Sequence, residues 1–168
     1  MIFSERNKIV NVYASIDATG ATVATDIVSL KNYNHATFII NFGACHTSAA
    51  TTTNLIAYKG EDVTTCNTAF ACKYRAELDA SADTLGALTA LAVTGVSLGS
   101  GNTLDIDTGG GFIVVEIDAA DLASTIANPY DTVRLGMVWA SQATLMSITC
   151  VLSQPRWADA AGPTAITD

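Results

Sequence analysis

The sequence predicts an all-β protein, and three of its features support that prediction. Many short segments alternate apolar and polar residues with a period of two, the pattern of a half-buried strand. Turn-forming residues separate these segments at intervals of roughly 8–12 residues. Long helical segments do not alternate with the strands, which excludes a βαβ arrangement. We therefore expect an antiparallel β-sandwich, jelly-roll-like in layout, with one short helix near residues 118–125 and extended arms at both ends.

The clearest alternation runs through residues 132–153. Its apolar residues share one face in each half: Val133, Leu135, Met137 and Trp139 in the first, and Met146, Ile148, Cys150 and Leu152 in the second. A short polar break at residues 140–143 separates the halves, so we predict a hairpin of two paired strands with its apolar face on the core. Arg134 and Thr149 lie on the polar faces and are candidates for contact with a partner.

The other strands are predicted from the same alternation. They are expected at residues 9–16, 22–30, 36–42, 54–59, 69–76, 91–98, 104–107 and 112–118. Residues 85–98 also fit a helical stripe, but β-branched residues and glycines favour a strand from residue 91 onward. Asp118 is expected to cap the short helix. His35 falls in a polar break at residues 31–35, with no evident partner.

A chain of 168 residues is most simply one domain with a sizeable core. We expect an N-terminal arm at residues 1–10, a β-sandwich domain at 11–153 and a C-terminal tail at 154–168. Charged residues make up only 14 % of the chain, and it contains 22 threonines and 27 alanines. This composition indicates a protein that hides much of its surface, for example against other subunits.

The charge and the apolar segments exclude several kinds of partner. A net charge of −8 and a pI near 4.4 argue against nucleic-acid binding, because phosphates need a basic surface. No stretch approaches about 18 consecutive apolar residues, so no membrane span is predicted. The N-terminal MIFSERNKIV lacks the apolar stretch of about 7–15 residues that a secretion signal needs. We expect the protein to be made and assembled in a cytoplasm.

The four cysteines do not form a disulfide framework. Cys66 and Cys72 flank a short loop and could pair across it, although free thiols are favoured. Cys45 and His46, with these two cysteines, supply soft ligands, but the chain has no C-x-x-C pair, so zinc is not expected. Cys45 and His46 also fail as nucleophile and base, because adjacent side chains in a strand point to opposite faces.

The acidic and glycine-rich segments resemble structural turns more than sites. Asp105, Asp107 and the glycines at 109–111 could suit calcium, but the spacing of an EF-hand and its closing Glu are absent. A strand ending in a glycine turn is the favoured interpretation. Neither glycine cluster has the spacing of a phosphate-binding loop. Because no nucleophile, base and orienting group come together, we predict a protein that is not an enzyme and needs no cofactor or metal.

Several segments together resemble a kind of small virion protein of tailed bacteriophages. They are VATDIVSLKNYNHATFIINFGA, NLIAYKGED, FIVVEIDAADL and the pair YDTVRLGMVWA and ITCVLSQPRW, within a pattern that runs from Ala21 to Trp157. The resemblance is a pattern of strands and contains no catalytic signature. It implies a structural role, typically as a capsid decoration (cement) protein that binds the outer head lattice and stabilises it.

This resemblance implies the major capsid protein as partner, a homotrimer as the oligomer, and the virion capsid surface as the location after assembly in the host cytoplasm. The arms at both ends are expected to make the contact. The candidate capsid-contact residues are Ile2, Phe3, Arg6, Lys8, Arg156 and Trp157.

Two alternatives remain open at this point. The first is a structural component of the tail or neck with the same fold. The second is a carbohydrate-binding β-sandwich module of a fibre, which would need exposed aromatic side chains. Its candidates are Tyr33, Tyr58, Tyr130, Trp139 and Trp157.

Overall fold

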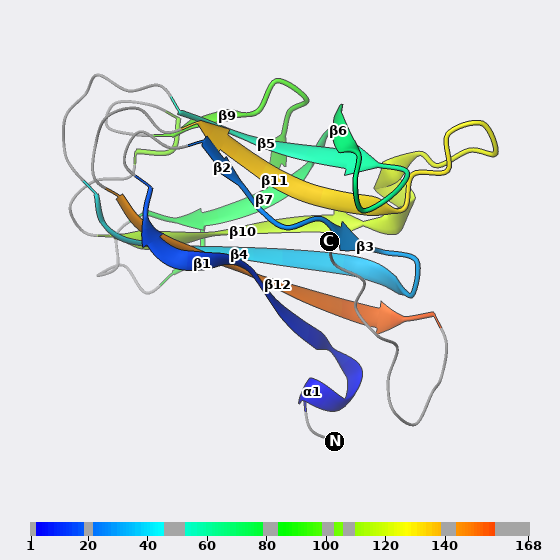
Figure 1. Cartoon of the computed structure of the whole chain (residues 1–168). Coiled ribbons are helices and arrows are strands. Elements are labelled where there is room, and N and C mark those ends of the chain that lie inside the picture. Colours follow the sequence, from blue (N-terminus) through cyan, green and yellow to red (C-terminus); the bar gives the residue numbers. More distant parts are fainter. Residues whose placement is uncertain are drawn as a thin grey trace.

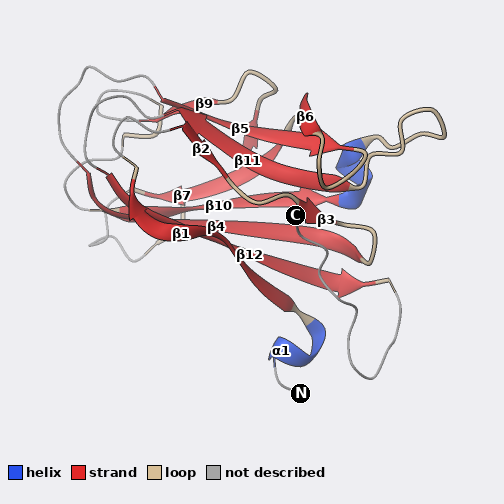
Figure 2. Cartoon of the chain, in the orientation of Figure 1, coloured by secondary structure: helices blue, strands red, loops and turns tan. Residues whose placement is uncertain are grey.

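The computed structural model describes residues 3–18, 22–45, 53–78, 84–98, 103–105, 110–138 and 144–156. Two antiparallel sheets stack face to face and enclose one core, which confirms the predicted all-β sandwich (Figure 1). Helix is confined to the four residues of α1 (Phe3–Arg6) and one 3₁₀ turn, η1 (Ala119–Leu122), within the described residues (Figure 2).

Each sheet has six strands in the described part of the chain. Sheet A runs in the order β1 (Lys8–Asp17), β12 (Thr144–Pro155), β4 (Tyr33–Cys45), β10 (Gly111–Asp118), β7 (Cys72–Glu77) and β8 (Thr89–Leu91). Sheet B runs in the order β2 (Thr22–Ala24), β11 (Thr132–Val138), β5 (Thr53–Gly60) and β6 (Cys66–Ala69). In addition, β3 (Val28–Ser29) pairs with β11, and β9 (Val96–Leu98) pairs with β5.

The inward faces are the ones that the alternation predicts. On β4, Phe38, Ile40 and Phe42 are buried, while Thr37 and Asn41 face outward. The same alternation holds on the neighbouring strands, where the buried residues are Ile113, Val115 and Ile117 on β10, and Met146, Ile148, Cys150 and Leu152 on β12. Burial of these apolar side chains between the sheets is the main stabilising term of the fold.

The predicted hairpin at residues 132–153 is wrong in its pairing. β11 belongs to sheet B, where it pairs with β2, β3 and β5, whereas β12 belongs to sheet A, where it lies between β1 and β4. The apolar faces of β11 and β12 therefore face each other across the core. Alternation shows which face of a strand is buried, but two strands of one hairpin and two strands of opposite sheets give the same pattern.

The strand expected at residues 22–30 is interrupted at Thr25. β2 pairs with β11 up to Ala24, and β3 resumes that pairing at Val28. Between them the Thr25 hydroxyl accepts a hydrogen bond from the Leu135 N–H at 3.0 Å. The next residue, Asp26, donates its backbone N–H to the Val12 carbonyl of sheet A at 2.9 Å. This interruption therefore connects the two sheets along one side of the sandwich.

Two further predicted strands are each divided between the sheets. Residues 69–76 separate into β6 in sheet B and β7 in sheet A, and residues 91–98 into β8 in sheet A and β9 in sheet B. The second crossing turns at Gly95, whose φ of +84° is a conformation that favours glycine. Of the strand expected at 104–107, the described residues show one bridge, between Leu104 and Leu98.

The short helix and the N-terminal arm also differ from expectation. The 3₁₀ turn η1 begins at Ala119, and Asp118 makes no side-chain capping hydrogen bond. At the N-terminus, α1 and the first residues of β1 occupy the segment expected as an extended arm at 1–10. β1 begins at Lys8 and forms one edge of sheet A, so the sandwich starts before residue 11.

Candidate functional site

Four of the six predicted contact residues lie in the described part of the chain, at one end of sheet A. Lys8 pairs with Leu152 near the end of β12, and α1 packs on both β1 and β12. Phe3 and Arg6 on α1 are exposed, as is Lys8. Arg156 follows β12 directly, where its side chain donates to the Tyr33 carbonyl at 3.3 Å. Ile2 and Trp157 lie outside the described residues.

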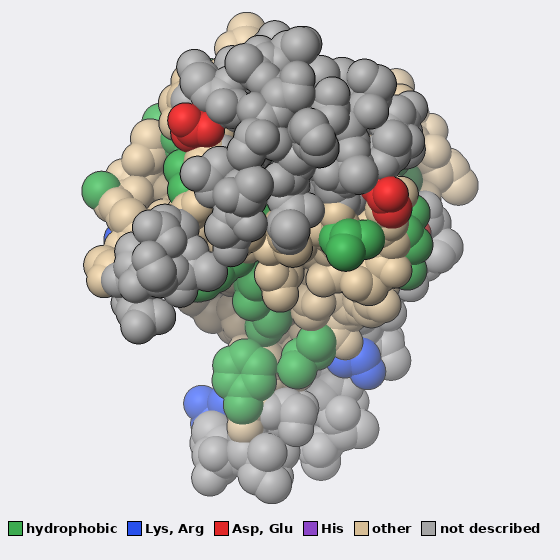
Figure 3. Space-filling view, turned by 90° about the vertical axis from the view of Figure 1, so that its left-hand side faces the viewer, with side chains coloured by type: hydrophobic (Ala, Val, Ile, Leu, Met, Phe, Trp, Pro, Cys, Tyr) green, Lys and Arg blue, Asp and Glu red, His purple; other side chains and the backbone are tan. Residues whose placement is uncertain are grey.

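Exposed apolar side chains follow the edge strand β1. Phe3 is 60 % exposed, Ile9 54 % and Ile16 46 %. Leu145, which pairs with Asp17 at the other end of β1, is also exposed. Figure 3 shows hydrophobic side chains together on the lower part of one side of the molecule, with Lys or Arg side chains on either side of them. Such a patch at a sheet edge is typical of a surface that contacts another chain.

The outer edge of β1 has no strand partner within the described residues. β12 pairs with one side of β1, and on the other side Val12 accepts the hydrogen bond from Asp26. The residues from Lys8 to Asn11 lie beyond this contact, toward α1. Backbone groups at such an edge can pair with a strand of another protein.

On the outward face of sheet A, His35 lies between two carboxylates. Its Nε2 is 2.6 Å from Glu116 Oε2, and its Nδ1 is 2.8 Å from Asp118 Oδ1. Thr37 donates its hydroxyl hydrogen to the same Glu116 oxygen at 3.0 Å. The register of β4 against β10 brings these residues together, because His35 pairs with Asp118 and Thr37 with Glu116.

These ion-pair contacts of His35 with Glu116 and Asp118 link β4 to β10. The two carboxylates can each accept a hydrogen bond from a ring nitrogen only when both nitrogens carry a proton. The arrangement therefore favours the positively charged imidazolium form of His35. Burial lowers the pKa of His35, but the hydrogen bonds to Asp118 and Glu116 and their negative charges outweigh it and raise the pKa above its usual value. With both ring nitrogens engaged, the imidazole has no lone pair with which to act as a base on the Thr37 hydroxyl.

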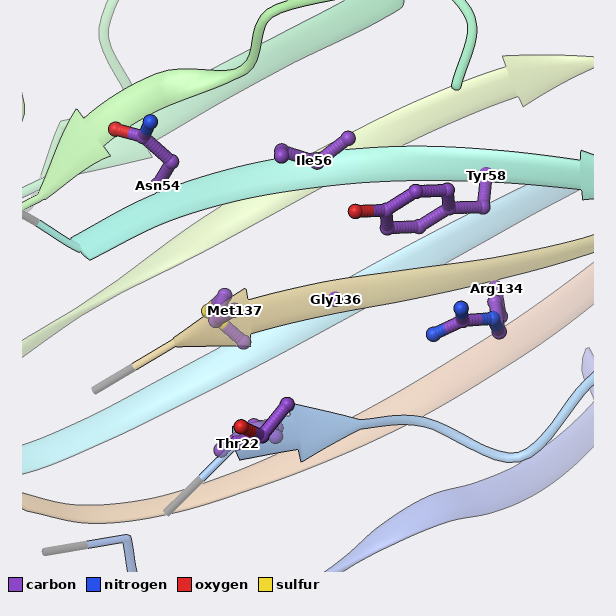
Figure 4. A pocket seen from close by; sticks show the side chains of 8 residues that line it. Thr22, Asn54, Ile56, Tyr58, Arg134, Gly136 and Met137 are labelled. Carbon is purple, nitrogen blue, oxygen red and sulfur yellow. The ribbon is translucent and has the colours of Figure 1, made fainter. Parts of the chain in front are cut away.

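The outward face of sheet B carries a shallow hollow around Gly136, with a volume of about 280 Å³ (Figure 4). Gly136 has no side chain, and a Cβ there would meet the Tyr58 ring at 2.8 Å. Tyr58 and Arg134 border the hollow, and the Arg134 guanidinium lies over the Tyr58 ring at 4.5 Å from its centroid. The remaining lining residues are Thr22, Val23, Asn54, Ile56 and Met137.

A second hollow, of about 240 Å³, lies near the end of the sandwich that carries Arg156. Tyr130 lines it, and Lys59 Nζ lies over the Tyr130 ring at 4.3 Å from its centroid while donating to the Leu122 carbonyl. Asp131 also lines it, and burial raises the pKa of that carboxyl although the charges of Lys31 and Arg156 oppose the rise. These contacts tie η1 to β5 and leave the Tyr130 ring partly covered.

The aromatic residues considered for a carbohydrate platform are dispersed. Tyr33 is buried, and Tyr58 and Tyr130 are each in contact with a cation. Trp139 and Trp157 lie outside the described residues. A flat platform of exposed rings is therefore not formed by the three described tyrosines, but Tyr58 borders a hollow with polar neighbours.

Cys66, Cys72 and Cys150 are free and buried. Cys66 lies on β6 in sheet B and Cys72 on β7 in sheet A, which explains why the possible local disulfide does not form. Burial raises the pKa of the Cys72 thiol to about 12, and burial raises that of Cys150 as well. The described residues include no cluster of three or more His, Cys, Asp or Glu placed to hold a metal ion. Asp105 is exposed, while Asp107, His46 and Gly109 lie outside the described residues.

Three features were missed by the sequence analysis. The polar break expected at 31–35 is shorter in the structure, because β4 begins at Tyr33 and so carries His35 on its outward face. A usable signal was present, since the predicted strand at 112–118 carries two charged residues, Glu116 and Asp118, at alternate positions and so on one face. The hollow at Gly136 and the exposed loop at residues 123–129 had no comparable signal. That loop is closed by hydrogen bonds between Thr125 and Asn128 and leaves Ile126 fully exposed.

Within the described residues, neither helical segment has the length or apolar character needed to cross a membrane. Comparison of the sequence with protein-family models gives no match, and comparison with curated protein sequences gives none either.

Proposed function

We propose that this protein is a structural component of a bacteriophage virion, a decoration (cement) protein that binds the outer lattice of the head. The observation that carries the proposal is the edge strand β1 with its leading turn α1. Exposed Phe3 and Ile9 stand there beside Arg6 and Lys8, at a sheet edge without a strand partner in the described part of the chain. The resemblance of the strand pattern to small virion proteins supports the same role.

The edge suits attachment to a regular lattice for a physical reason. A strand of the capsid protein could extend sheet A by pairing with β1, which gives main-chain hydrogen bonds, while Phe3 and Ile9 bury apolar surface against it. Arg6 and Lys8 add an attraction to acidic groups at the rim of the contact. The major capsid protein is the proposed partner, and a homotrimer at a three-fold position of the lattice is the proposed assembly.

The test uses heads assembled without this protein. Purified protein is added, and occupancy is measured by co-sedimentation and by imaging of the particles. We expect regular occupancy of lattice sites and a higher temperature of head disruption. An absence of ordered occupancy at saturating protein concentration would overturn the proposal.

A pair of variants tests whether β1 makes the contact. The double variant Phe3→Asp and Ile9→Asp should fold normally, since both side chains are exposed, and should lose binding. The matched control is Leu88→Asp, because Leu88 is 45 % exposed and precedes β8, the opposite edge of sheet A. Equal loss of binding in both variants would show that β1 has no special role. A variant that lacks the N-terminal segment would also test its role in binding. The deleted segment should end at residue 7, because Lys8 already belongs to β1.

The tail or neck location is the alternative role with the same chemistry. Copy number separates the two, because a decoration protein is present in hundreds of copies and a neck ring in about a dozen. Quantitative mass spectrometry of purified virions measures that number directly.

A further inference from the structure

We propose that the hollow at Gly136 on sheet B is a binding site for an acidic sugar, with Arg134 holding its carboxylate. The site lies on the opposite sheet from β1, so the proposal is independent of capsid attachment.

Arg134 is held in place yet keeps donors for a ligand. Its Nε donates to the Cys66 carbonyl, and its guanidinium stacks on Tyr58. These contacts leave the terminal nitrogens Nη1 and Nη2 without a hydrogen-bond acceptor among the described residues. Figure 4 shows both nitrogens pointing along the sheet toward Gly136. A guanidinium fixed in this way presents paired N–H groups, the geometry that binds a carboxylate through both oxygens.

The charge around the hollow favours an anion. The chain has a net charge of −8, yet Arg134 is the one charged residue among the described residues that line the hollow. No carboxylate of these lining residues therefore competes for the guanidinium. An anionic ligand would meet a local attraction that most of this acidic protein does not offer.

The rest of the lining suits a sugar ring. Asn54 and Thr22 are exposed and offer neutral groups to hydroxyls, while Ile56 and Tyr58 supply apolar surface. Asn54 and Arg134 stand at opposite ends of the hollow (Figure 4). Arg134 Nη1 lies 3.6 Å from the position that a Cβ of Gly136 would take, and Gly136 pairs with Ile56. The strand rise therefore places the guanidinium about 7 Å along the sheet from Asn54, a spacing that suits one pyranose ring. An aspartate or glutamate side chain of a protein would need Arg134 alone and would leave the polar groups at the far end unused.

The experiment is an NMR titration of the full chain, labelled with ¹⁵N, using three probes. Galacturonic acid carries the carboxylate, galactose is the matched neutral sugar, and N-acetyl-aspartate N-methylamide represents a protein carboxylate. We expect galacturonic acid to cause saturable shifts of the backbone amides at positions 54, 56, 134 and 136, with a millimolar dissociation constant that weakens with added salt. Galactose should bind at least about tenfold more weakly, because it lacks the charge-assisted pair.

Two variants and one control locate the site. Arg134→Gln should abolish the shifts. Gly136→Ala should also weaken them, because the new Cβ would stand 2.8 Å from the Tyr58 ring, so the ring on which the Arg134 guanidinium stacks must shift. Arg75→Gln is the matched control, since Arg75 lies on sheet A and donates to the Gly86 carbonyl. The amide spectrum itself reports whether each variant is folded.

Any of the following results would overturn the proposal. The first is an absence of saturable shifts with galacturonic acid at its highest soluble concentration. The second is equal binding of galactose, or unchanged binding by folded Arg134→Gln. The third is equal or tighter binding of the aspartate probe, which would assign the hollow to a protein partner.

Discussion

The imidazole Nε2 of His35 lies 2.6 Å from the carboxylate of Glu116, although the two residues are 81 positions apart in the chain. The contact joins β4 to β10 in the middle of sheet A, and Asp118 completes it from the other side of the ring. Because both acceptors are anionic, the cluster stabilises the fold most while the imidazole carries its second proton.

The stability of the protein should therefore depend on pH through His35. Its pKa is raised in the folded state above the usual value of 6.5. The stabilisation is thus fully present below about pH 6.5 and is lost as the pH rises through the folded pKa. We expect His35→Gln to lower the free energy of unfolding by about 1 kcal/mol at pH 6, and the difference from the parent protein to shrink by pH 9. Urea unfolding across this range measures it.

Controls for this prediction come from the same surface. Glu116→Gln should remove part of the same stabilisation, because it takes away one of the two carboxylates beside the ring. Asn41→Gln, at an exposed position of β4, should leave the pH dependence unchanged. A His35→Gln effect that stays constant from pH 6 to pH 9 would show that the ring acts through packing and not through its charge.

The faces of the strands could be predicted because side-chain direction in a strand has a fixed period of two. Phe38, Ile40 and Phe42 were assigned inward from the alternation alone, and they are buried. The same information does not say which strands are neighbours. The break at residues 140–143 lacks the Asn-Gly or Asp-Gly signal of a tight hairpin, and the strands on its two sides lie in opposite sheets.

The candidate sites were harder to predict because they depend on register between distant strands. His35 meets Asp118 across 83 residues, and Arg134 meets Tyr58 through the pairing of β11 with β5. Neither pairing follows from local pattern. The exposure of Phe3 and Arg6 was easier to predict, because both precede the first alternating segment and had no predicted place in the core.

The inward assignment of β12 can be tested by two alanine substitutions on that strand. Ile148 is fully buried, so Ile148→Ala should lower the free energy of unfolding by about 2–5 kcal/mol through lost burial and a cavity. Leu145 is 57 % exposed, and Leu145→Ala should cost less than about 0.5 kcal/mol. The reverse order, with Leu145→Ala costing more than Ile148→Ala, would mean that the register of β12 is shifted by one residue. Chemical denaturation measures both.

The buried thiols should resist alkylation in the folded protein. With a pKa of about 12, Cys72 is almost entirely protonated at pH 8, and Cys66 and Cys150 are buried as well. In a Cys45→Ser background we expect negligible reaction with a disulfide reagent at pH 8 in buffer, and reaction of three thiols in urea. One thiol reacting rapidly without denaturant would contradict the buried placement. Fewer than three in urea would indicate a disulfide.

Thr25 provides a test of the link between β2 and β3. Its hydroxyl is the acceptor for the buried Leu135 N–H, because the strand leaves sheet B at this point and no ladder carbonyl takes that place. Thr25→Val keeps the shape but removes the acceptor, so we expect a loss of about 1–3 kcal/mol in the free energy of unfolding. Thr25→Ser keeps the hydroxyl and should lose less than about 1 kcal/mol, the contribution of one methyl group.

The matched control is Thr22→Val, an exposed threonine on β2, which should change stability by no more than about 0.5 kcal/mol. Hydrogen exchange adds a local measurement, since the Leu135 amide should lose protection in Thr25→Val and keep it in Thr25→Ser. If Thr25→Val proves as stable as the parent protein and its Leu135 amide stays protected, another acceptor serves that amide. The hydroxyl would then have no part in holding the segment between β2 and β3 to β11, and the backbone bond from the Thr25 N–H to the Leu135 carbonyl would carry that connection alone.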